Sequence, residues 1–144
     1  MSTKIAVTVA AAGILLAAVP AWAHHAFAAE FDAKKPVHLV GKVSKVELIN
    51  PHAWIHIDVP EADGKTTEWM VEAGSPNILL RRGFTKTTVA VGTEVVVEGY
   101  QSKDGSNRAN GRDITLPDGK KLFLGSSNGT GAPYESKDAT KDKQ

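Results

Sequence analysis

The segment that most constrains the fold runs from residue 53 to residue 59, where apolar and polar side chains alternate. Successive side chains of a β-strand point to opposite faces, so this alternation predicts a strand with Ile55, Ile57 and Val59 facing a core. The other face carries side chains that a purely structural strand does not need, namely His52, Trp54, His56 and Asp58. The sequence therefore predicts that this second face is exposed and is the working surface of a β-protein.

Five further segments favour strands, and Asp-Gly pairs between several of them predict tight turns. We expect strands at 37–49, 53–59, 66–72, 94–100, 108–116 and 121–124. In the first strand the apolar residues move from odd to even numbers between Val43 and Val46, which predicts a β-bulge. The fifth strand is the least apolar of the longer ones and is expected at a sheet edge.

A short helix is expected between the third and fourth strands, at residues 75–83. Ser75 can cap it, Pro76 suits its first turn and Gly83 can end it. Its apolar residues, Ile78, Leu79 and Leu80, would plug one end of a barrel. This order of elements predicts an all-β fold with one short helix, an OB-fold-like Greek-key barrel of five to six strands. Another small barrel or a β-sandwich is the alternative.

The first 23 residues have the pattern of a secretory signal peptide, with Lys4, an apolar run at 5–19 and the small-residue site Ala21-Trp22-Ala23. An uncleaved membrane anchor is the alternative, but the apolar run is shorter than the ~20 residues that span a bilayer. We expect cleavage after Ala23, a barrel domain with an N-terminal arm at 24–125 and a disordered tail at 126–144. The expected location is the periplasm, with no transmembrane anchor after processing.

Charge and cysteine content exclude several classes of function. Removal of Lys4 with the signal peptide would leave 16 basic and 16 acidic side chains, whereas a nucleic-acid-binding domain needs a basic patch to neutralise phosphates. We therefore expect no nucleic-acid partner. The chain has no cysteine, which excludes disulfides and thiolate metal sites.

The new N-terminus is the sharpest candidate site. After cleavage His24 would present an α-amine and an imidazole that together can chelate one divalent ion, and Cu(II) stands highest in the affinity order for such donors. His25 is the second candidate ligand, and His52 or His56 could complete the site. These two lie about 13 Å apart on a straight strand, too far to bind one ion together. The alternatives are that His24 and His25 only follow the cleavage site and that His52 bonds the backbone of its turn.

A second hypothesis needs no metal. The face with His52, Trp54 and His56, together with Arg81 and Arg82, would then hold a periplasmic protein or a small ligand. No nucleophile–base pair or other catalytic constellation is recognisable, so we do not expect an enzyme.

Several short motifs spread over residues 24–119 resemble a known family. They include His24-His25-Ala26-Phe27, Asn50-Pro51-His52, Gly74-Ser75-Pro76, Arg81-Arg82-Gly83 and Asp104-Gly105-Ser106-Asn107-Arg108. This combination is similar to small exported proteins of Gram-negative bacteria classed as a domain of unknown function. The resemblance implies a periplasmic location and a compact β-barrel. It implies no activity, cofactor or catalytic residue.

Overall fold

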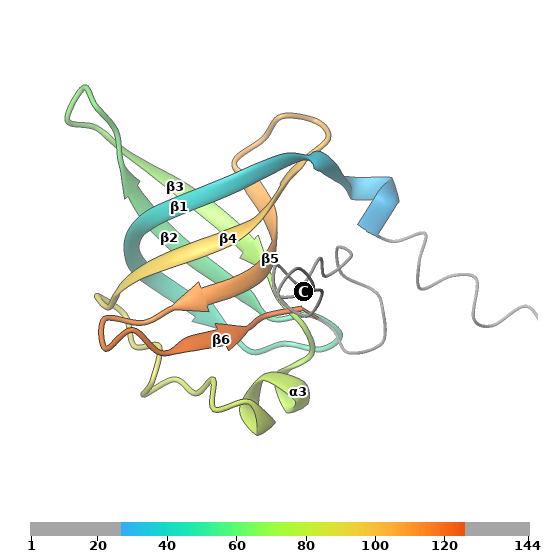
Figure 1. The fold of residues 1–144 in the computed structure, drawn as a ribbon, viewed down its shortest axis with the longest axis vertical. Helices are drawn as coiled ribbons and strands as arrows, with labels where there is room; N and C mark the ends of the chain where they lie inside the picture. The colour runs from blue at the N-terminus through green and yellow to red at the C-terminus, as the bar shows by residue number, and fades with distance from the viewer. Residues whose placement is uncertain (1–26, 126–144) are drawn as a thin grey trace, which may run out of the picture.

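The computed structural model describes residues 27–125. The predicted signal peptide, the histidines at positions 24 and 25 and the predicted tail at 126–144 lie outside this range. A single helical turn at 27–30 leads into six strands and one short helix (Figure 1). Their bounds are β1 Phe31–Glu47, β2 Trp54–Pro60, β3 Thr66–Glu72, α3 Pro76–Arg81, β4 Glu94–Ser102, β5 Arg108–Thr115 and β6 Lys121–Phe123.

Five of the strands close into a ring. The hydrogen-bonded order is β3-β2-β1-β4-β5-β6, and β3 also pairs with β5 in parallel, whereas the other neighbours are antiparallel. With a helix between β3 and β4, this is the predicted all-β, OB-like arrangement. The prediction that β5 is an edge strand is wrong, because β5 pairs with β4, β6 and β3 and thereby completes the ring.

β1 is long because it takes part in two ladders. Its first part pairs with β4 and its last part with β2, and the register shifts between Val43 and Lys45. This shift confirms the predicted bulge. Where the ladders meet, a Cβ on Gly41 would lie 2.3 Å from the carbonyl oxygen of Asp58, so only glycine fits between the two strands.

The core lies inside the ring and confirms the predicted inward face of β2. Ile55 and Ile57 are fully buried, together with Val71 and Val97 from neighbouring strands. Of the three residues predicted to plug the ring, Leu79 is fully buried, Ile78 is half-buried and Leu80 is 47% exposed, so the prediction holds for Leu79 alone. The α3 helix lies at one end of the ring (Figure 1).

The turns follow the predicted chemistry. Gly64, Gly105 and Gly119, each after an aspartate, have φ values of 83°, 77° and 83°, a region that glycine occupies without a Cβ clash. Ser75 precedes α3 and its backbone carbonyl accepts from Ile78 and Leu79, but its hydroxyl makes no capping bond, so the predicted side-chain cap is absent. No helix within residues 27–125 has the length and apolar character needed to cross a membrane.

Candidate functional site

A row of side chains crosses the outer face of the ring at one level. The strand registers place Tyr100 opposite Asn110, Asn110 opposite Glu72, Glu72 opposite Trp54 and Trp54 opposite Glu47. Five strands contribute one residue each, so a spacing of about 4.8 Å between strands sets the distances along the row. This row, defined by these five residues, is the frame of the candidate site.

His52 joins the row through Glu72. Its Nδ1 lies 2.8 Å from Oε1 of Glu72, and its side chain is 31% exposed. Hydrogen bonds between Ala53 and the chain at Ala73 and Gly74 fix the backbone beside His52, which places the imidazole next to β3. An ionised carboxylate only accepts hydrogen bonds, so a neutral imidazole that donates to it from Nδ1 keeps its lone pair on Nε2.

Glu72 is the buried acid of the site. Burial raises the pKa of its carboxyl above the usual value, against the opposing effect of His52, and nearby Glu30 raises the pKa further. Asn110 contributes a weak contact, with Nδ2 3.5 Å from Oε1 of Glu72. The Glu72 side chain is thus held between His52, which precedes β2, and Asn110 of β5.

Arg108 links the row to the N-terminal turn at 27–30. Its guanidinium lies 5.2 Å from the centre of the Trp54 ring, and its Nη2 is 3.4 Å from Oε2 of Glu30. Phe27, the first described residue, packs edge-on against Tyr100 at 5.9 Å between ring centres. The chain therefore arrives at residue 27 on the same face as His52 and Trp54.

His56 is less accessible than predicted. It is only 8% exposed, because Glu47 and Glu68 lie on either side of the imidazole and cover it. The prediction that His56 faces solvent is therefore wrong, although its side chain is on the predicted face. Trp54 is half-buried, with Arg108 over its ring.

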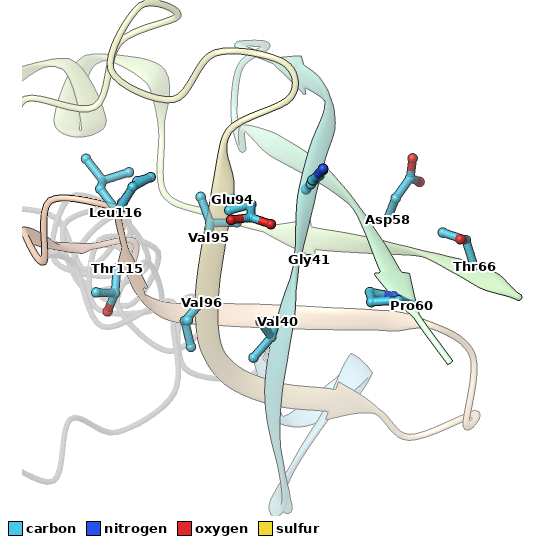
Figure 2. Close-up of a pocket in the computed structure, with 12 residues that line it drawn as sticks. Val40, Gly41, Asp58, Pro60, Thr66, Glu94, Val95, Val96, Thr115 and Leu116 are labelled. Carbon is cyan, nitrogen blue, oxygen red and sulfur yellow. The ribbon is translucent and has the colours of Figure 1, made fainter. Parts of the chain in front are cut away.

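Hollows of different size lie on the surface of the described residues, and two of them bear on the site. The smaller, of about 360 Å³, is lined by Glu47, Ile49, Asn50, Pro51, His52 and Trp54, and so adjoins the row. The larger, of about 820 Å³, lies on another part of the ring, and Figure 2 shows Val40 and Val96 side by side at its border. Of the face predicted from the sequence as the working surface, Asp58 lines the larger hollow, whereas His52, Trp54 and His56 do not.

The two arginines of the predicted partner surface differ. Arg81 is exposed, but Arg82 lies 4.6 Å over the Phe123 ring and donates to the backbone carbonyls of Phe123 and Gly125. Arg82 therefore fastens the end of the domain to α3, and this role occupies its guanidinium.

The predicted metal ligands are brought together only in part. His24 and His25 lie outside the described residues, and His52 and His56 each pair with a different glutamate of β3. Within 27–125, no group of three or more His, Asp or Glu side chains is arranged to hold a metal ion. A metal site on this face needs donors from water or from residues before Phe27.

Sequence reasoning missed four residues of the site: Glu30, Glu47, Glu72 and Arg108. Glu72 is on the same strand face as Glu68 and Met70, but the sequence gives no sign that it is buried. The contacts of Arg108 with Trp54 and Glu30 depend on ring closure, and their partners are 54 and 78 positions away. Only the alternation in β3 could have directed attention to Glu72.

Fold and site together define a small OB-like β-protein with a histidine–carboxylate surface site beside its N-terminal turn. The chain belongs to the family of unknown function DUF6152, whose model matches residues 11–111. No curated protein and no solved structure matches the chain.

Proposed function

We propose that this protein is an exported periplasmic binding protein that holds a divalent transition metal, preferably Cu(II), through His24, His25 and His52. The observation that carries the proposal is the contact between Nδ1 of His52 and the Glu72 carboxylate at 2.8 Å. A metal-binding histidine commonly donates its other ring N–H to a carboxylate, which fixes the tautomer and turns the free nitrogen to the metal. His52 has this partner and is partly exposed, so Nε2 is suited to bind an ion arriving from solvent.

The reach of the chain supports participation of the N-terminal histidines. Phe27 packs on Tyr100, which stands two strands from Glu72 in the row, or about 10 Å away. Three residues of extended chain, from His24 to Phe27, span at most about 10 Å. The α-amine and imidazole of His24 can therefore reach His52 if signal-peptide cleavage falls after Ala23.

Copper titration of the mature protein, beginning at His24, tests the proposal. We expect Cu(II) affinity far tighter than millimolar, weakened at least tenfold by His24→Ala and by His52→Ala. One alanine added before His24 moves the α-amine and should weaken binding similarly. His38→Ala is the matched control, because His38 is an exposed imidazole paired with Glu98 on the β1–β4 ladder.

The proposal fails if His52→Ala and the added alanine leave Cu(II) affinity unchanged, or if His38→Ala weakens it equally. Export is tested separately by mass spectrometry of the periplasmic fraction, which should find a chain starting at His24. A chain in that fraction that keeps residues 1–23 would refute cleavage after Ala23 and the amine ligand, and absence of the protein from the fraction would refute export.

The second candidate function is capture of a small ligand or partner without metal. The hollow of about 360 Å³ favours it, because Ile49, Pro51 and Trp54 give it apolar walls next to His52. Capture experiments from periplasmic extract should then lose the partner with Trp54→Ala, under chelating conditions that remove metals. An unchanged set of captured molecules would count against this hollow.

A further inference from the structure

The cluster of Glu47, His56 and Glu68 has an unfavourable contact that calls for a cation. The His56 side chain is 10% exposed, and its Nδ1 lies 3.2 Å from Oε1 of Glu68. Its Nε2 is fully buried and has no hydrogen-bond partner. The nearest charged group to Nε2 is Oε2 of Glu47, at 3.7 Å.

The protonation of the His56 imidazole determines whether its Nε2 presents a proton or a lone pair to Glu47. The Glu68 carboxylate accepts a hydrogen bond from Nδ1, so a neutral imidazole carries its single proton there. Nε2 then directs a lone pair at the negatively charged Glu47. A buried lone pair beside a partly exposed carboxylate is unfavourable, and a positive charge between them, either a proton or a metal ion, resolves the conflict.

No hydrogen bond joins Nε2 and Glu47 at their observed separation, which is close to the separation that a bridging metal ion requires. An N–H···O hydrogen bond has its heavy atoms about 2.7–3.2 Å apart, shorter than the 3.7 Å found. A zinc ion about 2.0–2.1 Å from nitrogen and 2.0–2.2 Å from oxygen holds those atoms about 3.4 Å apart in tetrahedral geometry. A small rotation of the Glu47 side chain, which is 25% exposed, closes that difference.

We propose that Glu47 and His56 bind one divalent cation of the Zn²⁺ type at a second site, with Glu68 as the positioning residue that holds the imidazole. Imidazole nitrogen and carboxylate oxygen are both ordinary zinc ligands. Lys45 pairs with Oε1 of Glu47, which leaves Oε2 for the metal. Glu47 also borders the small hollow, so water entering from there can complete the coordination.

Two features set the strength of this site. Two protein ligands give weaker binding than the four of a structural zinc site. The Lys45 ammonium repels a bound cation, so removing this charge should strengthen binding. A higher Zn²⁺ affinity in a variant without the Lys45 charge would distinguish metal binding from a purely structural role of Glu47, His56 and Glu68.

The experiment uses Zn²⁺ and the variant His24→Ala/His25→Ala/His52→Ala, which lacks the site of the proposed function. We expect this chain to bind one Zn²⁺, with affinity lowered at least tenfold by Glu47→Gln or His56→Asn and raised by Lys45→Ala. The matched control is Glu98→Gln, since Glu98 and His38 are already at hydrogen-bond distance, 2.6 Å. Because the background lacks the N-terminal donors, failure of the proposed copper site does not affect this result.

Imidazole nitrogen NMR provides the second readout on the same folded protein. Zn²⁺ should shift the Nε2 resonance of His56 and leave that of His38 unchanged. The proposal is overturned if Zn²⁺ does not bind, if Glu47→Gln binds Zn²⁺ as before, or if both His56 nitrogens carry protons at pH 7. The last result would show that a proton is the cation.

Discussion

Substitution of Glu72 by glutamine tests how the candidate site holds His52. The carboxylate accepts from Nδ1 at 2.8 Å and so keeps the proton away from Nε2. A glutamine amide can instead donate to Nδ1, which moves the imidazole proton to Nε2 and removes the lone pair a metal needs. Loss of such an outer partner commonly weakens metal binding 10- to 100-fold, or about 1.4–2.7 kcal/mol.

We therefore expect Glu72→Gln to weaken Cu(II) binding by this factor, measured in competition with a chelator of known affinity. Glu98→Gln, which removes the carboxylate paired with exposed His38, is the control and should leave Cu(II) binding unchanged. Unchanged affinity in Glu72→Gln would refute the role of the carboxylate. An equal loss in Glu98→Gln would point to overall charge as the cause.

Glu72→Gln should also change how the free energy of unfolding depends on pH, and this change needs no metal. Burial raises the pKa of Glu72 in the folded protein above its reference value of 4.5, so the folded state binds the proton more tightly than the unfolded chain. The Glu72 contribution to stability is then most favourable below pH 4.5 and is lost as pH rises through the folded pKa. Denaturant titrations should show wild type losing stability relative to Glu72→Gln over this window, and a difference that stays constant with pH would contradict the raised pKa.

Three further predictions concern the scaffold. Leu79→Ala should lower the free energy of unfolding by about 3 kcal/mol, because Leu79 is fully buried, whereas exposed Leu80→Ala should change it by less than about 0.5 kcal/mol; urea unfolding followed by circular dichroism measures both. Gly41→Ala should destabilise by about 2 kcal/mol or more in the same assay, since its Cβ would meet a backbone oxygen at 2.3 Å. Hydrogen bonds from Ser106 and Ser102 lower the pKa of Asp104 to about 2 from 3.8, so its stabilising effect should persist above pH 3.8 and disappear as pH falls to about 2; wild type and Asp104→Asn should converge in stability over that range.

Local patterns predicted much of the fold. The alternation around Ile55 and Ile57 identified the buried face of β2, and the change of phase after Val43 located the bulge in β1. These features depend on neighbours in sequence, because strand periodicity and turn chemistry are local properties. Closure of the ring depends on strands that are far apart in the sequence. The pairing of β5 with β3 uses backbone groups and leaves no apolar pattern in the sequence, so the sequence wrongly predicts β5 at an edge.

The site was predictable only in part for the same reason. The unusual composition of the β2 face pointed to His52, Trp54 and His56, but the partners that define their roles come from other strands. His56 was expected in solvent because sequence alone does not show that Glu47 and Glu68 enclose it.

His52 and His56 each contact a glutamate through Nδ1, and this shared contact bears on what their Nε2 atoms can bind. His52 meets Glu72 through Nδ1, and His56 meets Glu68 through Nδ1, so β3 supplies the acceptor in both cases. In a neutral imidazole this contact leaves the lone pair on Nε2, and the two Nε2 atoms have different surroundings. The Nε2 of His56 faces Glu47 within the sheet, whereas His52 is partly exposed beside the hollow and the N-terminal turn. Because solvent access governs how readily a bound ion exchanges, we expect the proposed His52 site to exchange its metal faster than the proposed His56 site.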